Sequence, residues 1–423
     1  MVLRPTIPEL ASTPVVMRAG STTIVAADPV EVVTAHRTDA LRALDELTPG
    51  WWAGVLTYDL GRSVERVTCR LAADPELPDL VLARYDARLL ITDTGTNLVG
   101  SPDARSRLER RVERAPRVAD PTQLGSARST LEKHEFEAGV RAIVALIESG
   151  ECYQVNLTRQ LAWDQGADPI ALFHSLADRN PAPHAALVTL PVLPGAETVV
   201  VSSSPERFLA WRGRDVETRP IKGTAVDAAW LRASAKDRAE NVMIVDLARN
   251  DLGRVCEYGT VHVPELCGVE AHPGLHHLVS TIRGRLREGV GPGGLVRATF
   301  PPASVTGAPK PRVLQAIEDL EPTRRGVYCG AIGWLDTERD EGDLAVAIRT
   351  FVVNSEGTRL GVGGGIVADS DPAAEWRETE LKAAQLLVAA AGQRANGESE
   401  LAGAASVPKG GRRHPATERA RPE

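Results

Sequence analysis

The sequence lacks the features that mark secreted, membrane-spanning and disulfide-stabilised proteins. Its 423 residues include only five cysteines, and no two of them form a Cys-x-x-Cys pair, a pattern that favours reduced thiols in a cytosolic protein. Residues 1–6 contain no apolar stretch of a secretory signal, and the longest run without a charged residue, 180–196, contains four prolines. Because that run is also shorter than a typical spanning helix, we expect a cytoplasmic protein that does not enter a membrane.

The sequence also lacks an excess of basic residues. It has 49 Lys and Arg against 56 Asp and Glu, so the net charge is −7, and the pI is near 5.8. Because a nucleic-acid-binding protein usually needs a broad basic face, we expect no nucleic-acid partner. The hydrophobic share of 43% and the charged share of 25% are typical of a globular protein. The length predicts two or three domains, or one large α/β or α+β unit.

Several common catalytic motifs are absent. No glycine is followed by lysine, which excludes the phosphate-binding loop that ends in Gly-Lys-Ser/Thr. Neither the G-x-S-x-G motif of hydrolases nor the H-E-x-x-H motif of zinc proteases occurs. The glycine-rich segment 361–366 lacks the spacing of a dinucleotide fingerprint. It can be a flexible turn or a place where the backbone approaches an anionic ligand closely, and its spacing leaves both interpretations open.

Hydrophobic periodicity divides the chain into three regions, 1–125, 126–392 and 393–423. The first two alternate irregularly between helical and strand patterns, which favours an α+β fold over a doubly wound parallel sheet. The third has Leu401 and Val407 as its only large aliphatic residues, so we expect a disordered tail. The sequence predicts helices at 30–47, 136–147, 236–251 and 372–391, a solvated helix or a linker at 103–113, and strands at 51–58, 81–91, 153–158 and 344–353.

Acidic residues on two of the predicted helices could bind a metal ion. Glu240 lies one helical turn after Lys236, and Glu375, Glu378 and Lys382 share one face of the last helix. Such residues usually form solvated salt bridges, each contributing about 0.3–0.5 kcal/mol. Carboxylates from two helices are also the usual ligands of Mg²⁺. The spacing alone does not choose between these functions.

Six segments of the sequence closely resemble the chorismate-utilising enzymes, a family that includes the anthranilate, aminodeoxychorismate, isochorismate and salicylate synthases. The resemblance is collinear over about residues 130–391, and it is weaker before them. The segments are 204–207 (Ser-Pro-Glu-Arg), 220–224 (Pro-Ile-Lys-Gly-Thr), 240–254, 300–310, 363–366 (Gly-Gly-Gly-Ile) and 375–379 (Glu-Trp-Arg-Glu-Thr).

The resemblance implies a fold, a cofactor and a division of the chain. The fold is α+β, with two large antiparallel sheets packed face to face and helices outside them. Residues 1–125 would be the N-terminal region of a component I protein, and residues 126–392 the catalytic region that binds chorismate. The family uses Mg²⁺ on the ring carboxylate of chorismate, and its ligands correspond to Glu240, Glu375 and Glu378 in this sequence.

Two positions separate the reactions of the family. Isochorismate and salicylate synthases carry a lysine that activates water where this sequence has Gln154, and an amide cannot take up a proton. Anthranilate synthases read Pro-Ile-Ala-Gly-Thr where this sequence has Lys222, whereas aminodeoxychorismate synthases read Pro-Ile-Lys-Gly-Thr. A neutral lysine amine is a nucleophile, so the resemblance implies covalent attack by Lys222 on C2 of chorismate.

The same resemblance assigns the remaining site residues and the partner. Glu206 would be the general acid for the leaving C4 hydroxyl. Ammonia from a separate glutamine amidotransferase subunit would then add at C4, giving 4-amino-4-deoxychorismate for p-aminobenzoate and folate synthesis. The residues expected to bind the substrate or line the site are Gln154, Thr224, Lys236, His277, Thr306, Tyr328, Arg349, Gly363, Gly364 and Lys382.

Three other functions remain open at this stage. The chain could be an anthranilate synthase component I, although Lys222 argues against it. It could be another enzyme that aminates chorismate at C2, or a regulatory homologue that binds chorismate without turnover.

Overall fold

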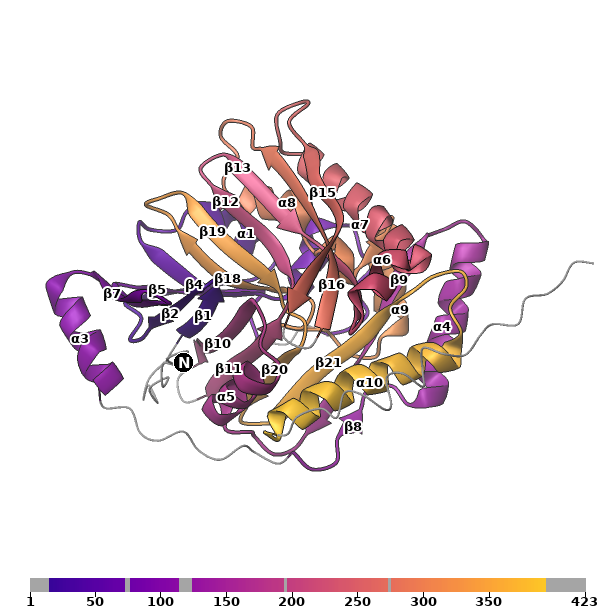
Figure 1. Cartoon of the computed structure of the whole chain (residues 1–423), viewed down its shortest axis with the longest axis horizontal. Coiled ribbons are helices and arrows are strands. Elements are labelled where there is room, and N and C mark those ends of the chain that lie inside the picture. The colour runs from indigo at the N-terminus through magenta and orange to yellow at the C-terminus, as the bar shows by residue number, and fades with distance from the viewer. Residues whose placement is uncertain (1–14, 73–76, 114–123, 194–195, 273–274, 393–423) are drawn as a thin grey trace, which may run out of the picture.

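Two large antiparallel sheets form the body of the molecule (Figure 1). The structure is a computed structural model that describes residues 15–72, 77–113, 124–193, 196–272 and 275–392. The predicted tail, 393–423, lies outside the described residues. The α+β class with two antiparallel sheets and surrounding helices, predicted from the resemblance, is confirmed.

The first sheet has eleven described strands. From one edge to the other they are β17 (Gly307–Ala308), β9 (Gln154–Trp163), β21 (Gly357–Ile366), β20 (Thr350–Asn354), β11 (Ala196–Ser204), β10 (His184–Leu193), β1 (Val15–Ala19), β2 (Thr22–Ala26), β6 (Ala87–Thr92) and β7 (Gly95–Gly100), with β8 (Arg128–Ser129) paired to β9.

The second sheet has ten described strands. In order they are β14 (Ile221–Ala225), β16 (Leu275–Arg285), β13 (Asp215–Arg219), β12 (Arg207–Arg212), β19 (Glu341–Val346), β18 (Ala331–Asp336), β4 (Trp51–Leu56), β5 (Leu80–Tyr85) and β3 (Glu31–Ala35), with β15 (His262–His272) paired to β16.

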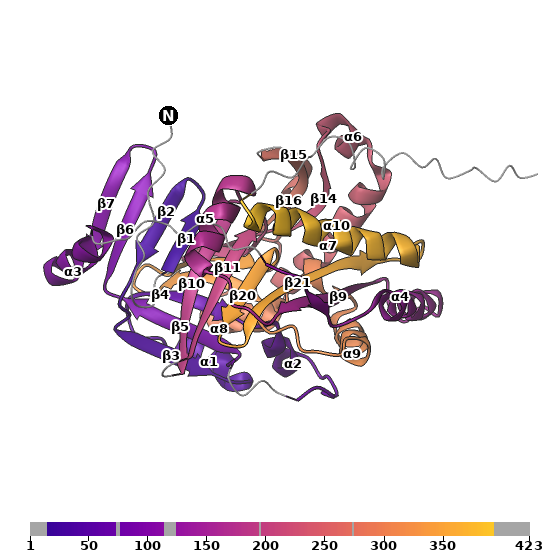
Figure 2. The same ribbon diagram turned by 90° about the horizontal axis from the view of Figure 1, so that it is seen from below.

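Helices cover the outer faces of both sheets, as Figures 1 and 2 show. Apolar residues of α1, α7 and α8 pack on the second sheet, and those of α5 and α10 pack on the first. The described helices are α1 (Thr38–Asp45), α2 (Gly61–Val64), α3 (Pro102–Glu113), α4 (Lys133–Glu148), α5 (Pro169–Arg179), α6 (Ala228–Ala233), α7 (Ala235–Gly253), α8 (Pro292–Thr299), α9 (Lys310–Leu320) and α10 (Pro372–Ala390).

The core between the sheets mixes residues from both ends of the chain. Met17 and Val188 of the first sheet belong to the same buried cluster as Trp51, Ala53 and Ile332 of the second. Strands that precede residue 125 therefore extend both sheets and share their cores. The predicted boundary near residue 125 is not tested by this arrangement and stays a prediction.

The predicted helices at 136–147, 236–251 and 372–391 are confirmed by α4, α7 and α10, and segment 103–113 is a helix, α3. The start of α10 is capped as its sequence predicts. Asp371 accepts a hydrogen bond from the N–H of Ala374, and a proline occupies the first turn. Gly150 follows α4 with a φ of 79°, the left-handed conformation that favours glycine after a helix.

Three other predicted elements were wrong in extent. The helix predicted at 30–47 is strand β3 followed by the shorter helix α1, because the chain turns at Arg37, whose φ is 54°. The strand predicted at 81–91 is two strands, β5 and β6, in different sheets, and the strand at 344–353 divides into β19 and β20 near Arg349. The alternation of apolar and polar residues along a strand continues where the chain passes from one sheet to the other, so it does not reveal the change of sheet.

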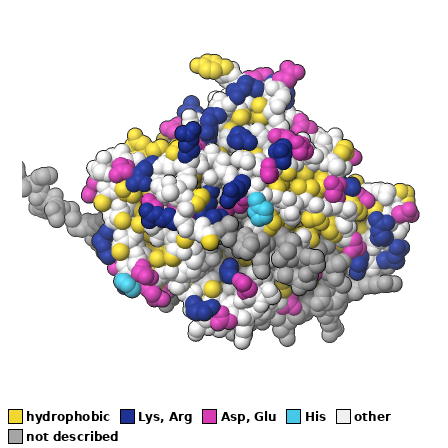
Figure 3. Space-filling model, turned by 180° about the vertical axis from the view of Figure 1, so that it is seen from behind, with side chains coloured by type: hydrophobic (Ala, Val, Ile, Leu, Met, Phe, Trp, Pro, Cys, Tyr) yellow, Lys and Arg dark blue, Asp and Glu magenta, His cyan; other side chains and the backbone are white. Residues whose placement is uncertain are grey.

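Acidic and basic side chains are interspersed on the face of the molecule in Figure 3. None of the described helices is long and apolar enough to span a membrane. All five cysteines are free thiols, and only Cys69 is exposed.

Candidate active site

Glu206 and Lys222 form the centre of the candidate site. Glu206 immediately precedes β12 and is 4% exposed. Burial raises the pKa of its carboxyl to about 7, although Lys222 and the Ile221 backbone favour the charged form. A raised pKa keeps more of the carboxyl protonated near neutral pH, and the protonated form is the one that a general acid uses.

Lys222 lies in β14, the edge strand of the second sheet. Burial lowers the pKa of its amine, while the carboxylates of Glu240 and Glu206 act in the opposite direction. Among the described residues its one hydrogen bond goes to the carbonyl oxygen of Ser304, at 3.2 Å. The structure thus brings the predicted nucleophile, which is half-buried, near the predicted acid, which is buried.

Carboxylates and lysines from α7 and α10 lie beside this pair. Lys236 is 3.9 Å from Glu240 on α7, and Lys382 is 2.7 Å from Glu378 on α10. Lys382 holds the pKa of Glu378 below its usual value. Burial raises the pKa of Glu240 and of Glu375, and in both cases the charge of Glu378 adds to this effect. The three carboxylates therefore act on one another as one cluster.

The cluster adjoins the glycine-rich end of β21. A Cβ atom on Gly364 would lie 3.4 Å from Oε2 of Glu375 and 3.9 Å from Oε1 of Glu378. Lys382 donates a hydrogen bond to the carbonyl oxygen of Gly363, at 2.9 Å. Of the two interpretations of segment 361–366, the structure favours close backbone approach, because the segment is a buried strand next to charged groups.

The three carboxylates are of a type that suits a hard cation, but they are not arranged to hold one. Oxygen atoms of Glu240, Glu375 and Glu378 are ligands that Mg²⁺ prefers. Within the described ranges, however, no three His, Cys, Asp or Glu side chains lie close enough together to hold a metal ion. The lysines Lys236 and Lys382 pair with the carboxylates, so a cation would have to displace them. The metal assignment stays a prediction.

Arg349 is a cation without a charged partner in the described part of the chain. It lies between β19 and β20, with a φ of 51°. In the described part of the chain its guanidinium has no hydrogen bond or ion pair, and burial lowers its pKa. Burial, and to a smaller extent the charge of Arg349, lowers the pKa of His277 to about 3. Nδ1 of this neutral histidine is 2.8 Å from Oγ1 of Thr224.

Gln154 is a second buried polar group without a partner. It is fully buried, and among the described residues neither its amide nitrogen nor its amide oxygen has a hydrogen bond. A Cβ atom on Gly365 would lie 2.7 Å from the Gln154 nitrogen, so the glycine leaves the amide its space. Because an unpaired buried amide is costly, Gln154 and Arg349 both point to a polar ligand.

The other two predicted residues, Thr306 and Tyr328, lie deeper in the fold. The hydroxyl of Thr306 donates to the carbonyl oxygen of Pro302, at 3.1 Å, within its own loop. The ring of Tyr328 packs against Gly361, where a Cβ atom would come within 2.2 Å of it. No described hydrogen bond joins either side chain to Lys222 or Glu206.

One residue of the candidate site was missed from the sequence. Ser304 accepts a hydrogen bond from Lys222 through its carbonyl. It lies in segment 300–310, which carries the resemblance, but a backbone contact leaves no signal in residue type.

Comparison with known proteins identifies the family. Residues 12–388 match the family model described as chorismate binding enzyme. The chain belongs to the chorismate binding enzyme family. It is therefore an enzyme of chorismate metabolism, as predicted, and chorismate is its substrate.

Relatives of two kinds are similar over most of the chain. Aminodeoxychorismate synthase component 1 of Klebsiella aerogenes is 41% identical over 347 residues, covering 79% of this chain and 76% of the relative. Anthranilate synthase component 1 of Streptomyces coelicolor is 36% identical over 400 residues, covering 86% and 77%. The crystal structure of anthranilate synthase component I from Streptococcus pneumoniae superimposes with a TM-score of 0.76 at 26% identity, covering 87% of this chain and 92% of that one.

Proposed function

We propose that this chain is the chorismate-aminating component of an aminodeoxychorismate synthase, a transferase that makes 4-amino-4-deoxychorismate from chorismate and ammonia. The observation that supports it best is that half-buried Lys222 and buried Glu206 lie close enough for their charges to interact, with the pKa of the lysine lowered and that of the carboxyl raised. The names of several relatives at 37–41% identity agree with this function.

The reaction needs Lys222 neutral and Glu206 protonated at the same time. The Lys222 amine forms a bond to C2 as the ring double bond shifts and the C4–O bond breaks. Glu206 gives its proton to the departing hydroxyl, which leaves as water. Ammonia then forms a bond to C4, the C2–N bond to Lys222 breaks, and the free amine is restored. Burial favours the neutral forms of both groups, which is the protonation state that the first step requires.

The two carboxylates of chorismate fit the two charged parts of the site. The unpaired Arg349 guanidinium and the backbone of Gly363 and Gly364 would bind the enolpyruvyl carboxylate. Mg²⁺ held by Glu240, Glu375 and Glu378 would neutralise the ring carboxylate. The side chains of Lys236 and Lys382 line the same cluster.

We also propose that a separate glutamine amidotransferase subunit supplies the ammonia. The printed name of the relatives, component 1, supports a second subunit. The product would serve p-aminobenzoate and folate synthesis. Five free cysteines suit the reducing cytoplasm, where we place the reaction.

Anthranilate formation is the second candidate function. It is supported by the similarity to anthranilate synthases in both sequence and structure. That reaction places the amine at C2 and eliminates pyruvate, so it needs no covalent lysine. Lys222 is the residue that favours amination at C4.

Product analysis separates the two functions. Purified protein is mixed with chorismate, Mg²⁺ and an ammonium salt, and the products are separated and identified by mass and by comparison with standards. We expect 4-amino-4-deoxychorismate, formed faster as pH rises toward the pKa of ammonium, and no product with glutamine alone. Anthranilate as the main product would contradict the proposal, and glutamine use by the lone chain would contradict the separate subunit.

A further inference from the structure

Asp251 and Lys310 are buried charges within segments that carry the family resemblance, yet the proposed reaction gives neither a role. They are 6% and 7% exposed. Nζ of Lys310 donates to Oδ2 of Asp251 at 2.6 Å and to the carbonyl oxygen of Thr299 at 2.7 Å. Arg254 donates to the other oxygen of Asp251, at 3.1 Å.

This ion pair closes a loop on itself. The loop comprises residues 300–309, between α8 and α9, and the side chain of Lys310 at the start of α9 binds the carbonyl of Thr299 at the end of α8. Asp251 fixes that closure to α7, the helix that also carries Glu240. We refer to Asp251, Lys310 and the Thr299 carbonyl as the clasp.

The loop closed by the clasp presents the Ser304 carbonyl to Lys222, whose amine donates a hydrogen bond to it. Ser304 and Glu206 line the same cavity, and the buried Ser304 hydroxyl has no hydrogen-bond partner among the described residues. The second half of the loop is fixed independently, because the N–H groups of Asn156 and Tyr153 donate to the carbonyls of Thr306 and Ala308 at 2.8 Å each.

The first half of the loop is buried, with Phe300 against Phe208 and Pro301 against Gly61, but it does not fill the space toward α7. A cavity lies between Pro302, Ala303 and Ser304 on the loop and Ile244 and Ala248 on α7, and Asp251 and Glu206 also line it. Because the cavity leaves this half of the loop with fewer packing contacts toward α7, polar contacts contribute to its position there. The clasp is one such polar contact with α7.

We propose that Asp251 and Lys310 are positioning residues that hold the Ser304 carbonyl against the Lys222 amine. This inference rests on the proposed function for its catalytic meaning, but the geometry it describes exists without substrate. An acceptor carbonyl stabilises the ammonium form of a lysine, so release of the loop lowers the pKa of Lys222 and misplaces its amine. Misplacement of a reacting group by about 1 Å can reduce a rate by about 100-fold.

The test uses the double variant Asp251→Asn/Lys310→Met, which removes both charges together. Replacement of a buried ion pair by neutral groups is often tolerated, whereas removal of one partner leaves an unpaired charge. The amide oxygen introduced in place of the Asp251 carboxylate can still accept the hydrogen bond from Arg254. The matched control is Arg88→Met/Asp336→Asn, a pair of similar burial at 3.5 Å that joins β6 to β18. In the second sheet β18 is separated from β14 by four strands.

The first measurement needs no turnover. Acetylation of Lys222 is followed by peptide mass spectrometry as a function of pH in substrate-free protein, with the exposed Lys133 as internal reference. We expect the midpoint for Lys222 to move to lower pH in the double variant, and to move less in Asp251→Asn alone, while the control double variant keeps the wild-type midpoint. An unchanged midpoint, or one that moves to higher pH, would overturn the proposal.

The second measurement is turnover of chorismate with ammonium. We expect kcat to fall about 10-fold or more in the double variant, with KM for chorismate within about threefold of wild type. Equal kcat in the double variant and wild type would also overturn the proposal. If wild-type protein made no 4-amino product, the proposed function would fail, while the acetylation profiles would still decide whether the clasp positions Lys222.

Discussion

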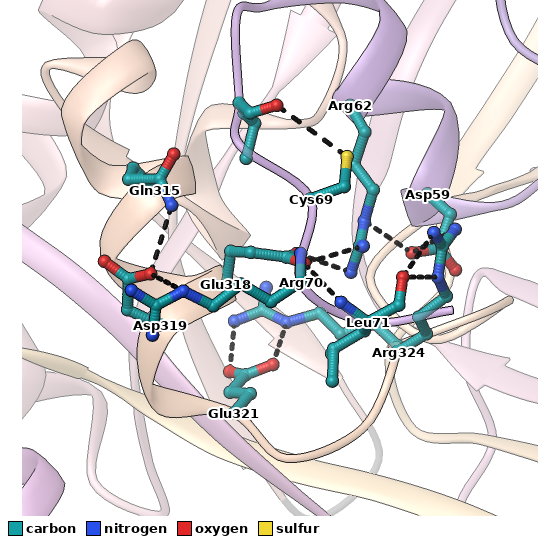
Figure 4. Close-up of polar contacts among 12 residues, drawn as sticks. Asp59, Arg62, Cys69, Arg70, Leu71, Gln315, Glu318, Asp319, Glu321 and Arg324 are labelled. Carbon is teal, nitrogen blue, oxygen red and sulfur yellow. Dashed lines mark hydrogen bonds and ion pairs between the residues drawn. The ribbon is translucent and has the colours of Figure 1, made fainter. Parts of the chain in front are cut away.

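Two groups of buried charges in this protein differ in how completely they are paired. Around α9, Asp59, Arg62, Glu318 and Arg324 form a network with the backbone of residues 70–71 (Figure 4). Glu318 alone accepts hydrogen bonds from Arg62 and from the N–H groups of Arg70 and Leu71, at 2.6–3.1 Å. In the candidate active site, by contrast, Arg349 and Gln154 have no partner in the described part of the chain.

This difference separates structural charges from charges that await a ligand. A buried charge costs several kcal/mol unless its neighbours replace the lost water. In the α9 network Glu318 has three hydrogen-bond donors without a ligand and so holds residues 62–71 against α9, although Oδ1 of Asp59 has no hydrogen bond among the described residues. The active site is incomplete without a ligand, so binding of an anionic substrate can recover the cost of burying Arg349. The predictions below test this distinction.

Replacement of the nucleophile should give the largest effect on activity and little effect on stability. We expect Lys222→Ala to reduce formation of 4-amino-4-deoxychorismate by at least about 10³-fold, because a covalent step is lost. Residual product should shift toward the 2-amino compound or anthranilate, since ammonia can then reach C2. The thermal midpoint should stay near wild type, and Lys133→Ala on the surface of α4 is the control. A near-normal rate with unchanged product would rule out Lys222 as nucleophile.

Loss of a carboxylate from the acidic cluster should come next. We expect Glu240→Gln or Glu378→Gln to reduce turnover about 100-fold or more with the fold intact, because an amide is a poor ligand for a hard cation. The measurement is turnover against Mg²⁺ concentration. The control is Glu137→Gln, another carboxylate 3.9 Å from a lysine one turn away. Normal turnover by both variants in excess EDTA would contradict the Mg²⁺ assignment.

In the α9 network the opposite pattern is expected. Glu318→Ala removes the acceptor of two backbone N–H groups and one of the two carboxylate partners of Arg62, so the free energy of unfolding should fall by about 3–5 kcal/mol. Values of kcat and KM at 25 °C should stay within about twofold of wild type. Denaturant unfolding and steady-state kinetics on the same sample measure both. A loss of kcat without a loss of stability would show that this network serves the reaction.

The smallest effect concerns the pH dependence of stability. The pKa of Glu206 is about 7 in the folded protein against an ordinary value of 4.5. The folded state therefore binds an extra proton between pH 4.5 and 7, and Glu206 lowers stability as pH rises through that window. We expect Glu206→Gln to be more stable than wild type at pH 8, by about 1–3 kcal/mol, and equal to it near pH 4.5. If the free energies of unfolding of the two proteins changed in parallel with pH across this range, the carboxyl of Glu206 would titrate normally.

The acidic cluster shows how much of the candidate site could be predicted from residue spacing. The positions of Glu375, Glu378 and Lys382 at i, i+3 and i+7 placed them on one helix face, and in α10 Lys382 does contact Glu378. The pairing of Lys236 with Glu240 followed from the same spacing. Residue spacing could not predict that α7 and α10 come together at the end of β21, because this arrangement depends on the order of strands in the two sheets.

The sequence by itself determined the family, the α+β class, the main helices and the presence of Lys222 in place of alanine. These are properties of residue type and local period, and they survive in a linear chain. Only the tertiary structure decided that the strands at 81–91 part into different sheets, that Gln154 and Arg349 stay unpaired, and that a carbonyl of Ser304 meets Lys222. Those facts depend on burial and on contacts between residues far apart in the chain. The pKa of Glu206 belongs with them, because the protein around a carboxyl, and not the residue itself, determines how much water it loses.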